Sequence, residues 1–113
     1  MAILHPATVT PTKLELTSGW APAQSWFVGD RTAELTVVGS FRFDDRDGEV
    51  GIETLLVRAG TDAVMQIPLT YRGAPLLGGE RWLIGTMDHS VLGPRWVYDA
   101  VGDPAYIAET AFA

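Results

Sequence analysis

Apolar and polar residues alternate through the middle of the chain, and this period-two pattern predicts β-strands. From residue 34 onward it predicts a half-buried strand. The apolar face of that strand is expected to carry Leu35, Val37, Phe41 and Phe43, and its polar face Glu34, Thr36, Ser40 and Arg42. Residues 50–58 predict a second strand, and an Asp-Gly pair within residues 44–49 predicts a hairpin loop of more than two residues between the two strands.

A third strand is predicted after the turn at residues 59–62. One face of this strand is expected to carry Met65, Ile67, Leu69 and Tyr71, and the other Gln66, Thr70 and Arg72. Pro68 lies inside it, and because proline has no amide hydrogen to donate, the strand is expected at a sheet edge or with a bulge. Residues 81–87 and 95–100 predict two further strands around a loop.

Cap-then-proline pairs predict a short helix near each end of the chain. Thr10-Pro11 predicts a helix over residues 12–20, which Gly19 and Pro22 are expected to end. Asp103-Pro104 predicts a second helix over residues 105–111. The pattern therefore predicts an α+β protein with about five antiparallel strands and a short helix near each terminus.

Length and composition predict a single domain spanning residues 1–113. The chain is 47% hydrophobic and 19% charged, which is enough apolar residue to bury a core. Its net charge is −6, and its seven arginines and single lysine are scattered, so nucleic acid and anionic membranes are not expected as partners. No apolar run is long enough to span a bilayer, and no basic leader precedes one, so we expect a cytoplasmic protein.

Candidate catalytic and metal-binding residues are few. Asp88, His89 and Ser90 have the residue types of a hydrolytic triad, but neighbours on a loop cannot adopt its geometry, so a polar turn is expected. The carboxylates of residues 44–49 lack the register of a calcium loop and are interpreted as a solvated turn. The chain has no cysteine and two histidines, and the glycines of residues 73–85 are not followed by Lys-Ser/Thr. No metal, cofactor or catalytic residue is therefore predicted.

The four tryptophans leave two interpretations open. Trp20, Trp26, Trp82 and Trp96 include either a platform for sugar rings or an anchor for another protein, although most tryptophans in so small a domain belong to its core. In the strand over residues 95–100, Arg95 and Asp99 alternate with Trp96 and Tyr98. The polar and aromatic side chains are thus expected on opposite faces.

Three segments together resemble the N-terminal cap domain of bacterial, chiefly actinobacterial, maltokinases and related sugar kinases. They are SGWAPAQSWFVGD, MQIPLTYRGAPL and LIGTMDHSVLGPRWVYDAVGDPAYI, in this order. The residues that match the family pattern are Trp26, Phe27, Gly29, Gln66, Pro68, Leu69, Tyr71, Arg72, Tyr98, Asp99, Asp103 and Pro104. The resemblance covers residues 14–108 and implies a curved, cystatin-like antiparallel sheet. Asp30 departs from the pattern, because the kinases commonly have a basic residue there.

The resemblance implies a noncatalytic, freestanding cap, because the two kinase lobes and their ATP-binding motifs do not follow residue 113. We expect it to bind or regulate an enzyme of α-glucan, glycogen, maltose or trehalose metabolism, and the alternative is an α-glucan-binding module. A homodimer is also open, whereas a glucan-processing enzyme is less favoured because no opposed pair of carboxylates can be identified. The candidate binding residues are Trp26, Phe27, Tyr71, Arg72, Arg95, Trp96, Tyr98 and Asp99.

Overall fold

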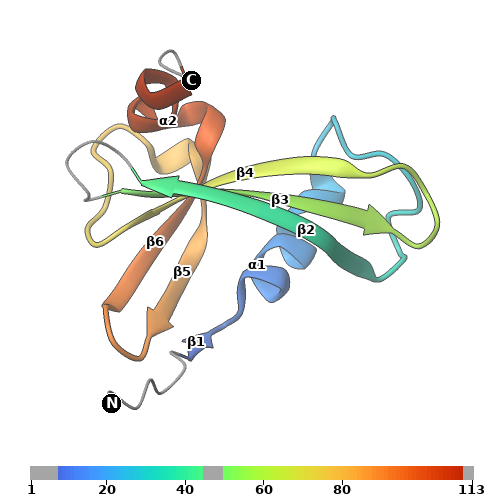
Figure 1. The fold of residues 1–113 in the computed structure, drawn as a ribbon, viewed down its shortest axis with the longest axis horizontal. Coiled ribbons are helices and arrows are strands. Elements are labelled where there is room, and N and C mark those ends of the chain that lie inside the picture. Colours follow the sequence, from blue (N-terminus) through green and yellow to red (C-terminus); the bar gives the residue numbers. More distant parts are fainter. Residues whose placement is uncertain (1–7, 45–49, 111–113) are drawn as a thin grey trace.

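The computed structural model describes residues 8–44 and 50–110, which form an antiparallel sheet that curls around a helix (Figure 1). The strands are β1 (Val9–Thr10), β2 (Leu35–Asp44), β3 (Gly51–Ala59), β4 (Met65–Arg72), β5 (Leu83–His89) and β6 (Gly93–Asp99). Their order across the sheet is β1-β5-β6-β4-β3-β2. The predicted α+β class is confirmed, and the strands number six among the described residues because β1 adds a two-residue strand at one edge.

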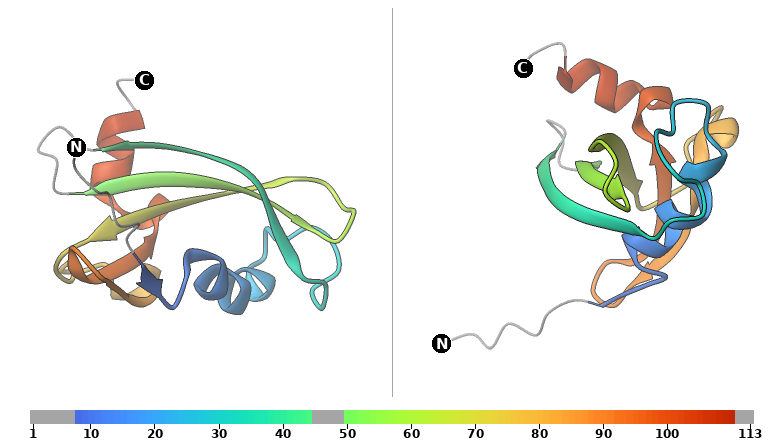
Figure 2. Two further views of the ribbon diagram at one scale, coloured as in Figure 1. Left: turned by 60° about the horizontal axis from the view of Figure 1, so that its bottom comes forward. Right: turned by 90° about the vertical axis from the view of Figure 1, so that its right-hand side faces the viewer.

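Helices lie on both sides of the sheet (Figure 2). α1 (Lys13–Trp20) continues into the 3₁₀ helix η1 (Ala21–Ala23), and α2 (Pro104–Thr110) follows the 3₁₀ helix η3 (Ala100–Gly102). A third 3₁₀ helix, η2 (Glu80–Trp82), leads into β5. Both predicted helices are present, so the expected helix near each terminus is confirmed.

The N-terminus of α1 is fixed by a capping box rather than by the predicted Thr10. The Thr12 hydroxyl accepts a hydrogen bond from the Glu15 amide, and the Glu15 carboxylate accepts one from the Thr12 amide. The predicted N-cap was therefore wrong by two residues. Gly19 lies within the helix, so the expectation that it ends α1 was also wrong, whereas Pro22 lies in η1, just beyond the last α-helical turn.

The hydrophobic core lies between α1 and the inner face of the sheet. Met65, Ile67, Leu69 and Tyr71 of β4 are all buried on this face, as the alternation predicted. α1 packs against β5, where the end of the Leu16 side chain lies over Gly85. The other buried apolar residues of this core are Ala21, Phe27, Leu35, Leu55, Val57, Ala59, Met87 and Val97.

β2 contains a bulge that overturns the predicted assignment of its faces. The pairing with β3 shifts between Val37 and Gly39, so one extra residue interrupts the alternation. Arg42 pairs with Glu53 and shares the inner face with Leu35, whereas Phe41 pairs with Thr54 and lies on the outer face. The predicted apolar face is thus divided between both sides of the sheet, and Phe41 is 52% exposed rather than half-buried.

Pro68 occupies the part of β4 that has only one neighbouring strand. β4 lies inside the sheet, but its pairing with β6 covers only Leu69 to Arg72. Pro68 pairs with Thr54 of β3 and has no β6 residue opposite it. The prediction that β4 is an edge strand was wrong for the strand as a whole. The half that holds Pro68 nevertheless has no strand on its β6 side, so the missing proline N–H breaks no ladder hydrogen bond there.

α2 starts on the outer face of the sheet, beside β4. Asp103 is its predicted N-cap, and its carboxylate accepts a hydrogen bond of 2.9 Å from the Ala105 amide, which confirms the prediction. β2 and β3 form the predicted hairpin, and residues 45–49, which hold most of the turn interpreted as solvated, lie outside the described residues. Within the described part of the chain, no helix has the length and apolar character that a membrane crossing requires.

Candidate functional site

An aromatic pocket lies where β4 and β6 diverge, on the side of the half-strand that holds Pro68. It has a volume of about 310 Å³. Its walls are contributed by the end of α1, the segment after η1, β4, η2 and the β6–η3 junction. The lining residues are Trp20, Gln24, Ser25, Trp26, Gln66, Ile67, Pro68, Trp82, Asp99 and Val101.

Three of the four tryptophans meet in this aromatic pocket. The rings of Trp20 and Trp26 are 5.6 Å apart between centroids and inclined by 57°, which is the tilted geometry that aromatic pairs favour. Trp26 is 39% exposed, so part of its ring faces solvent. Gly102 lies against the Trp82 indole so closely that any Cβ there would overlap the ring, so the backbone of η3 holds Trp82 in position.

Asp99 supplies a nearly buried carboxylate to the same pocket. It is 8% exposed, and burial raises its pKa, although a hydrogen bond from the Val101 amide opposes this rise. Gln24 and Gln66 add amide groups to the lining. Flat apolar rings beside a few hydrogen-bonding groups form the combination that binds ligands with both apolar and hydroxyl surfaces.

The structure separates the eight predicted binding residues into different places. Trp26 and Asp99 meet in the aromatic pocket. Phe27 follows Trp26 but is buried in the core, with the Arg31 guanidinium 5.7 Å from its ring centroid. Trp96 is half-buried on the outer face of β6, opposite Thr86 and Arg72.

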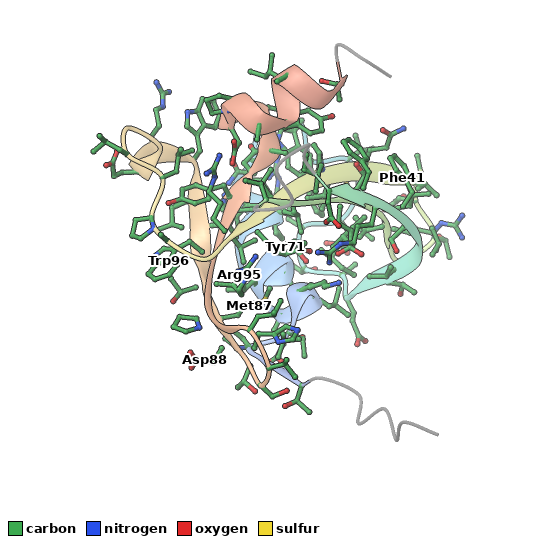
Figure 3. The ribbon with its side chains drawn as sticks, turned by 60° about the vertical axis from the view of Figure 1, so that its left-hand side comes forward. Phe41, Tyr71, Met87, Asp88, Arg95 and Trp96 are labelled. Carbon is green, nitrogen blue, oxygen red and sulfur yellow. The ribbon has the colours of Figure 1, made fainter. Side chains whose placement is uncertain are left out.

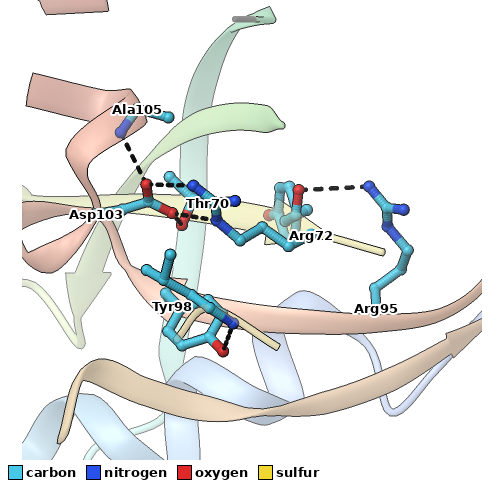
Figure 4. Close-up of polar contacts among 8 residues, drawn as sticks. Thr70, Arg72, Arg95, Tyr98, Asp103 and Ala105 are labelled. Carbon is cyan, nitrogen blue, oxygen red and sulfur yellow. Dashed lines mark hydrogen bonds and ion pairs between the residues drawn. The ribbon is translucent and has the colours of Figure 1, made fainter. Parts of the chain in front are cut away.

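Arg72 and Tyr98 take part in a polar cluster that joins the sheet to α2 (Figure 4). The Arg72 guanidinium binds both oxygens of the buried Asp103 carboxylate at 2.8 Å, and the Thr70 hydroxyl donates to the same carboxylate at 2.8 Å. The Leu76 amide donates to the Tyr98 hydroxyl at 2.7 Å. These contacts are internal, so both residues stabilise the fold where they lie.

Opposing effects act on the pKa of Asp103. Burial raises it, but the hydrogen bonds from Arg72, the Ala105 amide and Thr70 outweigh burial and hold the pKa below its usual range. The carboxylate therefore stays ionised at neutral pH, where it caps α2 and pairs with Arg72.

Tyr71 and Arg95 lie together, but away from the aromatic pocket. Tyr71 donates its hydroxyl hydrogen to Glu53 at 2.7 Å. Arg95 donates to the Tyr71 carbonyl at 3.3 Å, the bond drawn from Arg95 in Figure 4. Burial, followed by the hydrogen bond to Glu53 and its charge, raises the pKa of Tyr71. Burial also raises the pKa of Glu53, but its bonds to Lys13 and Tyr71 lower it overall. The two predicted residues thus belong to a second, cationic site.

The residues of the suggested triad have other partners. His89 Nδ1 accepts hydrogen bonds from the amides of Val91 and Leu92, and Ser90 Oγ accepts one from the Thr8 amide. These bonds shape the turn between β5 and β6. Across residues 8–44 and 50–110, no three His, Asp or Glu side chains converge as metal ligands would.

Sequence reasoning did not bring Trp20 and Trp82 to the same place as Trp26. The three residues come from α1, the segment after η1, and η2, so no spacing along the chain relates them. The nearest available signal was the proline inside a strand, since Pro68 marks the gap in the sheet beside which they gather.

A family model described as the maltokinase N-terminal cap domain matches residues 20–103. The match begins at the last residue of α1 and ends at the N-cap of α2, so it includes every strand except β1. No curated protein and no solved structure matches the chain. The residues that line the aromatic pocket all fall within the matched range.

Proposed function

Because the chain belongs to the maltokinase N-terminal cap domain family, we propose that it is a noncatalytic module that binds or regulates an enzyme of α-glucan, maltose or trehalose metabolism. The observation that carries this proposal is the family match over most of the sheet. The family description names a domain of a maltokinase, which is an enzyme, so an enzyme is the natural partner.

The edge strand β2 offers a surface for such a partner. β2 is the last strand of the sheet, and three of its large apolar side chains, Val37, Val38 and Phe41, are 40, 48 and 52% exposed. Val37 pairs with Val57 on the inner face and Phe41 pairs with Thr54 on the outer face, so exposed apolar side chains border this edge on both sides. An unpaired strand edge with exposed apolar side chains favours association with another chain. This supports docking of the partner enzyme through β2.

Replacing Phe41 by aspartate is expected to reduce capture of the partner enzyme at least about tenfold, because buried aromatic anchors dominate interface energies. The tagged protein is incubated with a native lysate of its source, with and without amylase, and bound proteins are identified by mass spectrometry. Val91→Asp is the matched control, since Val91 is 73% exposed on the β5–β6 turn, away from β2.

The proposal would be supported by stoichiometric capture of a glucan-pathway enzyme or sugar kinase that persists after amylase treatment. This capture should be lost in Phe41→Asp and retained in Val91→Asp. Capture of no enzyme of this class would contradict it. Equal loss in both variants would show that β2 is not the docking surface.

The aromatic pocket supports the alternative function, an α-glucan-binding module. If it binds α-glucan, maltooligosaccharide titration is expected to change the tryptophan fluorescence and to saturate, because sugar rings stack on indole faces. Trp26→Ala should abolish the saturable change, whereas Trp96→Ala, on the outer face of β6, should leave it. An unchanged spectrum up to millimolar sugar would exclude this function, and protein capture lost on amylase treatment would favour it.

A further inference from the structure

A second pocket lies on the inner face of the sheet, between β1, the start of α1 and strands β4 to β6. We call it the cationic pocket, and its volume is about 190 Å³. Figure 3 shows Tyr71, Met87 and Arg95 on the side of the sheet that faces α1, whereas Trp96 and Asp88 project from the other side. The lining residues are Val9, Lys13, Arg42, Tyr71, Met87, His89, Leu92 and Arg95.

We propose that the cationic pocket binds the phosphate group of a small molecule. Three of the eight lysines and arginines of a chain with net charge −6 converge here, from three distant parts of the sequence. Arg42 reaches the pocket only because the β2 bulge moves it to the inner face. Positive charges that gather in one pocket of an otherwise acidic protein create a local positive potential, which attracts an anionic ligand.

The cations surround one buried ring. Lys13 Nζ lies 5.5 Å and the Arg42 guanidinium carbon 5.6 Å from the centroid of Tyr71. Arg95 binds the carbonyl of the same residue through one amino group. A guanidinium carries five N–H donors in a planar fork that suits phosphate oxygens, so the bond to a carbonyl leaves further donors for a ligand.

In the part of the chain that the structure describes, fewer carboxylates than cations lie at the pocket. Glu53 binds Lys13 at 2.7 Å and the Tyr71 hydroxyl, and Asp44 lies 3.6 Å from Arg42 at the exposed end of β2. Within residues 8–44 and 50–110, no carboxylate forms an ion pair with Arg95. The Lys13 and Arg42 side chains are 36% and 48% exposed, so the site is open to solvent on one side. Among the described residues, three cations face the carboxylates of Glu53 and Asp44, and the one positive charge in excess favours an anionic phosphate.

His89 also lines the cationic pocket. Its Nδ1 accepts hydrogen bonds of 3.1 and 2.9 Å from the amides of Val91 and Leu92. A neutral imidazole whose Nδ1 accepts must carry its hydrogen on Nε2. The turn between β5 and β6 therefore fixes the tautomer that can donate to an anion.

The size and the walls of the pocket limit the rest of the ligand. Its volume is below the roughly 300–1,000 Å³ typical of sites for drug-sized molecules. Val9, Met87 and Leu92 form an apolar wall beside the cations. A free phosphate or the monoester of a small compound fits this description, and the two sources can be separated by experiment.

The test is calorimetric titration of the full chain at low ionic strength with three probes: inorganic phosphate, glycerol 3-phosphate and uncharged glycerol. Saturable binding of either phosphate, with none of glycerol, is expected. Tighter binding of glycerol 3-phosphate would identify a monoester site, and tighter binding of inorganic phosphate a site for the free ion. Failure of both phosphates to bind at about 10 mM would overturn the proposal, because functional pockets bind at or below the millimolar range.

Variants separate a specific site from general charge. Arg95→Gln and Arg42→Gln are each expected to weaken binding at least about tenfold, because each removes charge-assisted hydrogen bonds. Arg58→Gln, on the exposed outer face of β3, removes the same charge and should leave binding unchanged. Glu53→Gln should tighten binding several-fold, since it removes the opposing charge. Equal weakening by Arg58→Gln and Arg95→Gln would contradict a built site, and Arg42, on the edge strand, allows the test even if Arg95→Gln fails to fold.

Discussion

Replacing Asp103 by alanine is expected to lower the free energy of unfolding by about 3–5 kcal/mol, the cost typical of breaking a buried ion pair on one side. Asp103 is 0% exposed and serves three partners at once. Its loss would remove the carboxylate that pairs with Arg72 and accepts from the Thr70 hydroxyl, and it would remove the N-cap of α2. Urea unfolding followed by circular dichroism would measure the change.

Two further variants test the reason for this loss. Asp103→Asn keeps one carbonyl oxygen, which can still accept from the Ala105 amide, but its NH2 group cannot accept from Thr70 and the side chain carries no charge for Arg72, so it should fall between the wild type and Asp103→Ala. Asp88→Ala removes an exposed carboxylate from the outer face of β5 and should stay within about 0.5 kcal/mol of the wild type. A loss below 1 kcal/mol in Asp103→Ala would contradict the structural role of the cluster.

The lowered pKa of Asp103 gives this stabilisation a defined pH dependence. A carboxyl whose pKa is lower in the folded than in the unfolded state stabilises the protein above the unfolded pKa, which is about 3.9 for aspartate. The contribution falls as the pH drops through the folded value. The difference in melting temperature between the wild type and Asp103→Ala should therefore be full at pH 7 and shrink below about pH 4. A difference that grows on acidification would contradict this sign.

Replacing Ile67 by alanine is expected to cost about 2–5 kcal/mol, because it removes buried methyl groups and leaves a cavity. Ile67 is fully buried, pairs with Leu55 across the β3–β4 ladder and also forms part of the wall of the aromatic pocket. Ile67→Val keeps the β-branched shape and should cost only about 0.5–1.5 kcal/mol. Denaturant unfolding of the two variants gives the comparison.

The same pair of variants tests whether the core and the aromatic pocket are one packing unit. The tryptophan emission of folded Ile67→Ala should differ from that of the wild type, since its cavity opens toward Trp20 and Trp26. Equal stability losses in Ile67→Ala and Ile67→Val would show that the cavity is filled by rearrangement, contrary to the packing described here.

Strand alternation predicted the fold well where the sheet is regular. β4 buries the apolar residues that its alternation predicts, because it pairs with β3 without a register shift. The assignment of faces in β2 failed because a bulge adds one residue. Gly39, which lies at the register shift, was the available signal, since a glycine inside a strand often marks a bulge. The capping box Thr12-x-x-Glu15 was present in the sequence, but the proline at position 11 drew the predicted N-cap to Thr10.

The two pockets show the limit of sequence reasoning about sites. Trp26 and Asp99 were predicted as binding residues from separate segments, and the structure places both in the aromatic pocket. Lys13, Arg42 and His89 were not predicted beside Arg95, since the segments that carry them become neighbours only when the sheet curls over α1. Residue types could suggest which side chains bind a ligand. Which of them share a pocket depends on the curvature of the whole sheet, which no single segment reveals.

β1 is synthesised before the other strands but cannot pair until β5 has been made, because β5 is its partner in the sheet. Val9 lies opposite His89, and the contact between Thr8 and Ser90 joins residues 82 positions apart. On the ribosome, β2 to β4 can pair in sequence as they emerge, whereas the first strand must wait for nearly the last one, and such distant contacts form slowly. The walls of the cationic pocket come from both segments, so an anion bound there would hold β1 to the much later β5–β6 hairpin.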